Sequence, residues 1–467
     1  MKHAIWFDIT TIYAWTTTAV GIVRMEMECA QYALHYQPQI TCFCRLDRRL
    51  GYLAVSHEEV AMILMRLKNQ VAPKHFASPL SELPLTRMRL WKRRINRIIH
   101  FLPADMAETI WRFGVSRKQA VLALYRASQE VRLAFREVLH PNILRPADLA
   151  APNLLASHSL KPTPFGKEDV YISMGLDWEH KDMPHYLFSQ KRKIGFKVVL
   201  FCYDIIPIRL PHLCVGNVAA AFAKYFADVA WCADEIFCIS DFSKNDLRQF
   251  LESIGAPEPS MQVVRLGCDL VNEVEFSSDQ SIAELANIPY LLFVSTIERR
   301  KNHEVLYRAY LHLIDEGMTD LPKLVFVGKL GWGVQDFLAD LKFDPRIAKY
   351  VQILHHVTDA QLAFLYRRAY FTLFPSLYEG WGLPVAESLS IGKFCLASQS
   401  SSIPEVGGEL IEYLDPWDAS EWAARIAYYI DHPEELQKRE AQIAQLYKPV
   451  TWEMAGEQVF SRVKALL

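Results

Sequence analysis

Several common signatures of nucleotide-binding and hydrolytic enzymes are missing from this chain of 467 residues. It has no GxxxxGK(S/T) phosphate loop, no GxGxxG after an apolar run and no GxSxG nucleophile elbow. These absences argue against P-loop, dinucleotide-binding and α/β-hydrolase chemistry. An Asp-x-Asp pair, which could clamp a metal-bound diphosphate, is also missing. We therefore expect no metal site and no cofactor.

The chain also has little net charge, because 51 Lys and Arg are balanced by 53 Asp and Glu, giving −2. A general nucleic-acid binder needs a broad basic field, so no nucleic-acid partner is expected. The nine cysteines follow neither zinc-ligand spacing nor a CxxC pattern, which favours free thiols in a reducing compartment. Neither a signal peptide nor an apolar run of the ~20 residues needed to span a bilayer is evident. The sequence therefore predicts a cytoplasmic protein.

Apolar residues are plentiful, at 51% of the chain, and they alternate between two periodicities in its second half. Short buried-strand runs alternate with helical patterns, which is typical of a parallel, doubly wound α/β sheet. Ligands of such sheets bind beyond the carboxyl ends of the strands. The expected strands are 291–295, 323–328, 351–354, 371–375 and 394–397, and the expected helices are 303–316, 334–342, 359–369 and 384–392.

The first half repeats this pattern more loosely, so we expect two Rossmann-like domains facing each other across a cleft. Its expected strands are 4–9, 40–46, 169–174, 197–203, 235–240 and 262–266, and its expected helices are 21–35, 217–233 and 242–253. A polar, acidic stretch at 267–288 resembles a linker. The predicted domains are 1–275, with a helical insertion at about 57–150, and 285–450, followed by a helix at 451–467 that could cross back to the first domain.

One segment of the insertion, 87–102, has an apolar stripe containing Trp91 opposite a cationic face. Such a helix can lie on an anionic membrane surface, which would make the protein peripheral on the inner face of a membrane. An ordinary helix packed on the domain, with a solvated basic face, explains the pattern equally well. Both interpretations stay open.

The strongest local signal is the motif FPSLYEGWGLPVAE, in which Glu379 and Glu387 are separated by seven residues. Gly380 and Gly382 allow the backbone to approach a ligand closely, and Pro384 suits the first turn of a helix. The N terminus of that helix offers N–H groups and a partial positive charge to a phosphate. The carboxylates can instead accept hydrogen bonds from sugar hydroxyls, Glu379 from one sugar and Glu387 from another, such as a ribose.

This motif, followed by ASQSSSIPEVGGE, resembles the retaining GT-B glycosyltransferases of family 4, which include bacterial mannosyltransferases and sucrose synthases. The resemblance implies a GT-B fold, with Glu379 beside the donor sugar and Glu387 on the ribose. It covers about 285–450 closely and the first domain in patches, and it misses 57–150, which we expect to shape the acceptor site. The donor-binding residues that it implies around the motif are Gly380, Trp381, Gly382, Leu383 and Glu387.

A second stretch, FVSTIERRKNHEVLYRAY, is similar to the family segment that carries an Arg and a Lys for the donor diphosphate. Lys301 matches the Lys, whereas Thr296 stands at the Arg position, where Arg299 or Arg300 could compensate. A departing diphosphate needs cations to stabilise its developing charge. A solvated basic patch is the alternative for this cluster taken alone. The family also commonly reads the nucleotide base in the loop at Val357.

In the first domain, FDIT and AVGIVRMEMECAQYAL resemble the family's opening strand, glycine turn and helix. This places Gly21 near the phosphates, while Arg24 either reaches the cleft or packs its helix. The segment VVLFCYDIIPIRLP has Tyr203 and Asp204 where many members have a His facing the donor sugar. That departure puts the catalytic role at Tyr203 in doubt. The catalytic residues that the resemblance implies are Glu379, Lys301 and Asp204.

The resemblance implies a front-face reaction that retains anomeric configuration, without a protein nucleophile. The variants TIERRKN and YDIIP look most like bacterial mannosyltransferases of surface polysaccharide (O-antigen) synthesis, which favours GDP-mannose, although UDP- and dTDP-sugars remain options. The expected acceptor is a glycan or a lipid-linked glycan. Two alternatives stay open: a sugar-nucleotide epimerase, which consumes no acceptor, and a catalytically silent sugar-nucleotide-binding subunit.

Overall fold

The computed structural model describes residues 3–16, 19, 21–47, 50–68, 163–180, 182–214, 216–270 and 280–467, all of which belong to one compact unit. The helix expected at 87–102, for which both interpretations were open, and most of the predicted insertion at 57–150 lie outside these residues. Among the helices that the structure does describe, none is long and apolar enough to cross a membrane.

The first domain is built on a seven-stranded sheet with the order β3-β2-β1-β4-β5-β6-β7. All neighbouring strands are parallel except β2 and β3, which form an antiparallel pair at the edge. The strands are β1 (Ile5–Asp8), β2 (Thr41–Asp47), β3 (Gly51–Val55), β4 (Val170–Ile172), β5 (Lys197–Cys202), β6 (Glu235–Cys238) and β7 (Ser260–Val263).

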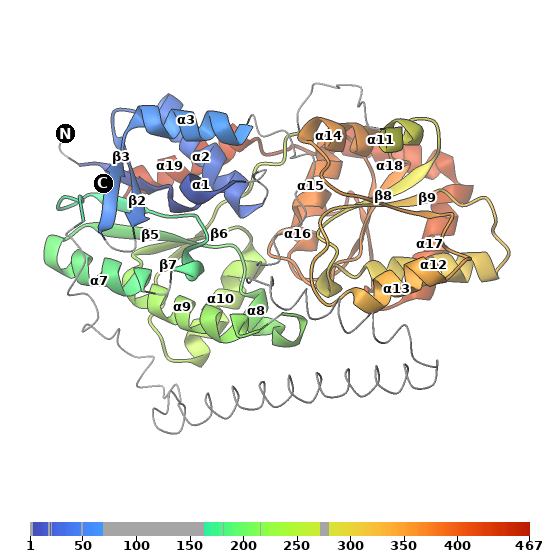
Figure 1. Ribbon diagram of the computed structural model, residues 1–467, viewed down its shortest axis with the longest axis horizontal. Coiled ribbons are helices and arrows are strands. Elements are labelled where there is room, and N and C mark those ends of the chain that lie inside the picture. Colours follow the sequence, from blue (N-terminus) through green and yellow to red (C-terminus); the bar gives the residue numbers. More distant parts are fainter. Residues whose placement is uncertain are drawn as a thin grey trace, which may run out of the picture. The chain divides into compact units, whose positions relative to one another are not determined.

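Helices cover both faces of this sheet, which explains why its strands are almost continuously apolar (Figure 1). The helices α2, α3 and α19 lie on one face, and α7, α9 and α10 lie on the other. The helices of this domain are α1 (Thr10–Ala14), α2 (Ile22–Tyr36), α3 (His57–Lys68), α7 (Met183–Ile194), α8 (Ile206–Arg209), α9 (Val218–Cys232) and α10 (Asp241–Ser253), with short 3-10 turns η1 (Asp177–Glu179) and η2 (Pro211–Leu213).

The second domain has a six-stranded, fully parallel sheet with the order β10-β9-β8-β11-β12-β13. Its strands are β8 (Tyr290–Val294), β9 (Lys323–Val327), β10 (Val351–Leu354), β11 (Phe371–Phe374), β12 (Cys395–Ser398) and β13 (Glu412–Leu414). Its helices are α11 (Gln280–Leu285), η3 (Arg299–Lys301), α12 (His303–Asp315), α13 (Gln335–Phe343), α14 (Asp359–Arg368), α15 (Leu383–Ser390), α16 (Ile403–Gly407), α17 (Ala419–Asp431) and α18 (Pro433–Leu446). The predicted α/β class with two doubly wound sheets is thereby confirmed.

The last helix, α19 (Trp452–Lys464), packs against α2 of the first domain. Gly456 permits this approach, since a Cβ atom there would lie 2.7 Å from the side chain of Tyr32. The ring of Phe460 stacks on Phe7 of β1, with centroids 5.9 Å apart. Helix α19 therefore packs on the first-domain sheet, which contains β1.

The structure contains elements that the sequence did not lead us to expect, including β3, β13, α7, α11, α17 and α18. The edge strand β3 was not predicted; it turns back from β2 at Gly51, whose φ of 85° suits glycine, and it buries Tyr52 and Val55. Helix α11 lies inside the stretch predicted to be a linker, because Ile282 and Leu285 are buried against the second sheet.

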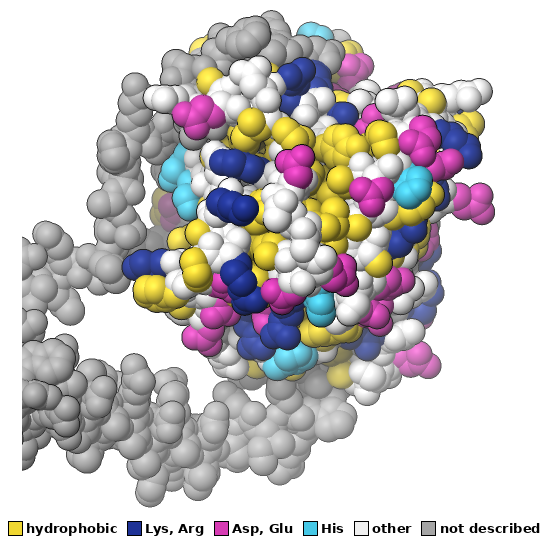
Figure 2. Space-filling view, turned by 90° about the vertical axis from the view of Figure 1, so that its right-hand side faces the viewer, with side chains coloured by type: hydrophobic (Ala, Val, Ile, Leu, Met, Phe, Trp, Pro, Cys, Tyr) yellow, Lys and Arg dark blue, Asp and Glu magenta, His cyan; other side chains and the backbone are white. Residues whose placement is uncertain are grey.

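Figure 2 shows the face of the molecule that forms the right-hand side of Figure 1. Lys and Arg side chains on this face are interspersed with Asp and Glu side chains, and hydrophobic side chains lie between them. The near balance of charge in the composition is thus also found locally on this face.

Candidate functional site

The two strongest sequence motifs meet where the second sheet reverses its strand order. Strand order runs from β8 outward to β10 in one direction and from β8 to β11 and β13 in the other. The carboxyl ends of β8 and β11 therefore lie at the switch point of the sheet, which is where ligands of such sheets bind. The turn η3 follows β8, and the β11–α15 loop, residues 375–382, follows β11. Leu377 donates its backbone N–H to the Arg300 carbonyl at 2.8 Å and joins the two segments.

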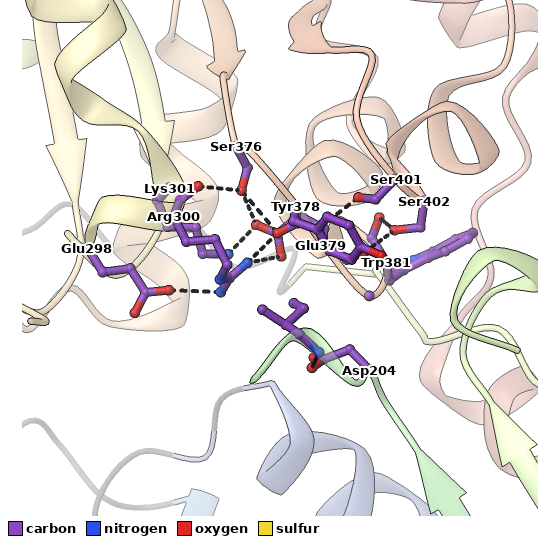
Figure 3. Close-up of polar contacts among 12 residues, drawn as sticks. Asp204, Glu298, Arg300, Lys301, Ser376, Tyr378, Glu379, Trp381, Ser401 and Ser402 are labelled. Carbon is purple, nitrogen blue, oxygen red and sulfur yellow. Dashed lines mark hydrogen bonds and ion pairs between the residues drawn. The ribbon is translucent and has the colours of Figure 1, made fainter. Parts of the chain in front are cut away.

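A partly buried ionic cluster lies at this junction (Figure 3). One carboxylate oxygen of Glu379 accepts hydrogen bonds from Lys301 Nζ and Ser376 Oγ, each at 2.5 Å. The other oxygen lies 3.0 Å from Arg300 Nη1. Arg300 also pairs with Glu298 at 2.8 Å. Two cations from η3 are therefore held in place by two carboxylates.

Charge pairing outweighs burial at Glu379, which is 8% exposed. Burial raises the pKa of its carboxyl group. Arg300 and Lys301 lower this pKa by more than burial raises it, so that the pKa lies at about 2. Burial, followed by repulsion from Arg300, lowers the pKa of Lys301, while Glu379 opposes this shift. The cluster formed by Glu298, Arg300, Lys301 and Glu379 has no net formal charge. Any anion that enters must compete with Glu379 for these cations or share them with it.

The first domain contributes Asp204, which follows β5 and accepts a hydrogen bond from the Ile206 backbone N–H at 3.0 Å. Burial raises the pKa of Asp204, and Arg300 opposes the shift. The surrounding backbone is tightly packed, since a Cβ atom on Gly380 would lie 2.4 Å from the carbonyl oxygen of Tyr203. Glycine is therefore needed at position 380 for the contact between the two domains.

The side chain of Tyr203 turns away from the cluster. Its hydroxyl group donates to the Met174 carbonyl at 2.7 Å, and the ring is buried in the core of the first domain. Tyr203 therefore does not occupy the place that the family resemblance gives to a histidine, and Asp204 is the side chain of this pair that approaches the cluster.

The β11–α15 loop is braced by serines from the segment after β12. Ser401 Oγ accepts from the Glu379 backbone N–H at 2.7 Å. Ser402 Oγ donates to the carbonyl groups of Glu379 and Trp381, both at 2.9 Å. Gly382, with φ of 116°, then allows α15 to begin at Leu383, so the first N–H groups of that helix follow the loop directly.

Glu387, on α15, belongs to a second group of residues. It is 6% exposed, and Tyr366 donates to its carboxyl group at 2.9 Å. Burial raises the pKa of Glu387 to about 7, against the opposing effects of Tyr366 and Arg24. Arg24, on α2, lies 3.7 Å from Asp359 and stacks over Trp452 at 5.0 Å. Arg24 thus both packs against α19 and approaches the residues near Glu387.

The remaining predicted residues occupy the edges of the site. Gly21 precedes α2 with φ of 54°, and the space beside its missing Cβ is open. Val357 is partly buried just before Thr358, which caps α14. Of the two arginines that could compensate for Thr296, Arg300 enters the cluster, whereas Arg299 is exposed.

The structure therefore brings Asp204, Arg300, Lys301 and Glu379 together and holds Glu387 in a separate group. Sequence reasoning missed the polar residues that support both groups, because serines and tyrosines outside a motif carry little signal. The serine-rich run QSSSIP contributed to the family resemblance but did not indicate any role for its individual serines. The residues missed are Glu298, Tyr366, Ser376, Ser401 and Ser402. Within the described part of the chain, no group of three or more His, Cys, Asp or Glu could hold a metal ion.

Comparison with known proteins identifies similar sequences. A family model described as "Glycosyl transferases group 1" matches residues 277–446. The serotype-specific mannosyltransferase WbdA of Escherichia coli is 28% identical over 245 residues, which are 49% of this chain and 29% of that protein. The O-antigen chain mannosyltransferase B of Escherichia coli is 29% identical over 235 residues, which are 50% of this chain and 60% of that protein. The match thus spans less than two thirds of either mannosyltransferase.

A further relative is covered more fully: the D-inositol 3-phosphate glycosyltransferase of Nocardiopsis dassonvillei is 30% identical over 304 residues, 60% of this chain and 69% of that protein. Among solved structures, the sucrose-phosphate synthase of Thermosynechococcus elongatus has a TM-score of 0.55 at 14% identity, covering 100% of this chain and 99% of that one. Anabaena HepE, solved with UDP and glucose, has a TM-score of 0.54 at 12% identity, covering 99% and 100%. These structures share the fold.

Proposed function

The chain belongs to the group 1 glycosyl transferases and has the GT-B fold, and we propose that it moves a hexose from a nucleotide sugar to a glycan or lipid-linked glycan with retention of configuration. The observation that carries this proposal is the partly buried cluster of Glu379, Lys301 and Arg300 at the switch point of the second sheet. That cluster combines cations for a diphosphate with a carboxylate for sugar hydroxyls.

The cations stabilise the leaving group. As the bond between the sugar and the diphosphate breaks, negative charge develops on the phosphate, and Lys301 and Arg300, which Glu379 holds side by side, stabilise that charge in our proposal. Glu379 keeps both cations charged and in place, and its carboxylate accepts hydrogen bonds from the donor sugar. The N terminus of α15 adds a partial positive charge. No protein nucleophile is required, because the departing phosphate takes the proton of the acceptor hydroxyl.

GDP-mannose is the proposed donor. Support comes from the two Escherichia coli relatives, which are named as mannosyltransferases, and from the sequence variants around Lys301 and Asp204. UDP- and dTDP-sugars are the competing donors. In each case Glu387 accepts hydrogen bonds from the ribose hydroxyls, and the loop at Val357 lies against the base.

A catalytically silent sugar-nucleotide-binding subunit is the second candidate. The orientation of Tyr203 favours this candidate. Its hydroxyl group donates to the Met174 carbonyl, so no side chain at position 203 replaces the histidine that many family members have facing the donor sugar. In contrast, Arg300 lies beside Lys301 in the cluster and could compensate for Thr296, which favours an active enzyme. Transfer of sugar to an acceptor, or slow hydrolysis of the donor, distinguishes the two.

The proposal is tested by thermal unfolding with GDP, UDP, dTDP and their sugars. A ligand at 100 times its Kd should add about 2.7 kcal/mol to the free energy of unfolding. We expect GDP-mannose to stabilise the native protein and the variants Lys301→Ala and Glu387→Ala to respond weakly. Lys342→Ala, an exposed lysine on α13, is the matched control. If no nucleotide stabilises the native protein, the proposed donor site is wrong.

Activity is expected to persist in excess chelator. Lys301, Arg300 and the α15 N terminus supply the positive charge that a divalent cation would otherwise bring to the diphosphate. The measurement is the initial rate of transfer with and without EDTA after extensive dialysis. Loss of activity in EDTA that is restored by Mg²⁺ or Mn²⁺ would contradict this expectation.

A further inference from the structure

Glu405, on α16 of the second domain, is not part of the ionic cluster and instead binds the first domain. One of its carboxylate oxygens accepts the backbone N–H of Asp241 at 2.9 Å, and the other accepts that of Phe242 at 2.7 Å. These N–H groups begin α10 of the first domain and have no partner within the helix. A carboxylate at a helix N terminus is also favoured by the helix dipole. Glu405 thus ties the two domains together at a defined point.

Arg265, which follows β7 of the first domain, extends this contact to the β11–α15 loop. Its guanidinium group pairs with Glu405 at 2.9 Å and with Asp241 at 3.1 Å. The same group lies 4.6 Å over the ring of Trp381. Trp381 is 8% exposed, and its indole extends away from Lys301 and Glu379 (Figure 3). Arg265 therefore covers the side of the loop opposite the ionic cluster.

Helix α10 contacts the same loop at two further points. Ser243 Oγ donates to the Gly380 carbonyl at 3.0 Å. The Tyr378 hydroxyl donates to Asp246, whose carboxylate also pairs with Arg209 at 2.9 Å. The loop that carries Glu379 is therefore held from the first domain on both sides of that residue.

We propose that Arg265 is a positioning residue for sugar transfer. Clamped by Glu405 and stacked on Trp381, it holds the β11–α15 loop in the geometry in which Glu379 receives the donor sugar. The groups proposed to bind diphosphate and ribose, Lys301 and Glu387, lie on the second domain and do not contact Arg265. Arg265 therefore reaches the nucleotide-binding groups only indirectly, through the loop and Glu379, so its loss should weaken binding of the sugar more than binding of the nucleotide. This inference rests on the proposed function.

The test is to compare a nucleotide sugar with its nucleoside diphosphate, using GDP-mannose and GDP. Arg265→Gln should weaken the nucleotide sugar roughly five- to tenfold and lower kcat, while the Kd for GDP changes by less than about twofold. Arg265→Lys, which keeps the charge opposite Glu405, should have an intermediate effect on binding and on kcat.

In the Trp381→Ala variant, adding Arg265→Gln should have little further effect, because the ring on which Arg265 stacks is already absent. Arg248→Gln is the matched control, since it removes an exposed Arg–Glu pair from α10 itself.

A second measurement needs no ligand. Hydrogen exchange of the β11–α15 loop amides should accelerate in Arg265→Gln but not in Arg248→Gln, because the loop loses its cover from the first domain. Unchanged exchange in Arg265→Gln would overturn the inference, whether or not the protein binds a nucleotide. A failure of the native protein to bind any nucleotide would instead refute the proposed function. Equal weakening of GDP and GDP-mannose by Arg265→Gln would also overturn it, because Arg265 would then support the domain contact in general.

Discussion

Lys301→Ala is expected to lower kcat for sugar transfer by roughly 10²- to 10³-fold, the cost of removing a preorganised group that stabilises developing charge. Lys301 is half-buried on η3, the turn that follows β8, and its Nζ lies 2.5 Å from Glu379. Its charge therefore acts in a region where water screens little. Because the leaving diphosphate gains charge only as the sugar departs, the loss should appear in kcat as well as in kcat/KM.

The fold should survive this change. Glu379 loses one cation but retains Arg300 on its other oxygen and Ser376 on the first. The free energy of unfolding should therefore fall by less than the about 3–5 kcal/mol typical of breaking a buried ion pair outright. Thermal unfolding without ligand checks this point, and Lys342→Ala controls for loss of charge. If Lys301→Ala kept native kcat, the diphosphate would have to bind elsewhere and the assigned role of the cluster would be wrong.

Donor affinity is expected to increase by roughly tenfold between pH 6 and pH 8, as Glu387 ionises with its pKa of about 7. The sign follows from burial. Below pH 7 the carboxyl group is largely protonated and has lost acceptor capacity, whereas above pH 7 the carboxylate accepts hydrogen bonds from the ribose hydroxyls. Isothermal calorimetry with GDP-mannose measures this effect. The nucleotide sugar is used because its diphosphate is a diester, so the ligand does not titrate in this range.

Glu387→Gln serves as the control, because the amide keeps the size of the side chain but does not titrate. This variant should bind more weakly at pH 8 and show a flat pH profile. Asp177, after β4 in the first domain, also has its pKa raised to about 7 by burial and by the charge of Asp8. A pH dependence that persisted in Glu387→Gln would point to Asp177 and would contradict the role proposed for Glu387.

The α/β architecture, and the segments that meet at the candidate site, could be predicted because both depend on short-range patterns. A strand buried on both faces must be apolar throughout, so five of the six second-sheet strands were recognisable as runs such as LLFVS and FTLFP, whereas the short edge strand β13 was not. Parallel strands end at the same edge, so the segments carrying Lys301 and Glu379 were expected to meet there. The edge strand β3 escaped prediction because it pairs on only one side and carries a mixed pattern.

Side-chain partners were decided by the tertiary structure. Nothing in the letters ERRK distinguishes Arg300, which pairs with Glu298 and Glu379, from the exposed Arg299. The orientation of Tyr203 into the first-domain core depends on Met174, which lies 29 residues earlier. Such contacts arise from packing between distant segments, and local periodicity carries no information about them.

The clamp formed by Arg265, Glu405 and Trp381 shows this division most clearly. The sequence was sufficient to mark the loop containing Trp381 and the stretch containing Glu405, because glycines and prolines at a strand-to-helix turn follow from backbone geometry. Arg265 belongs to another domain and lies 116 residues before Trp381 and 140 before Glu405. Only the folded chain brings these three side chains together, because their contact depends on how the two domains pack and not on the residues next to each in the chain.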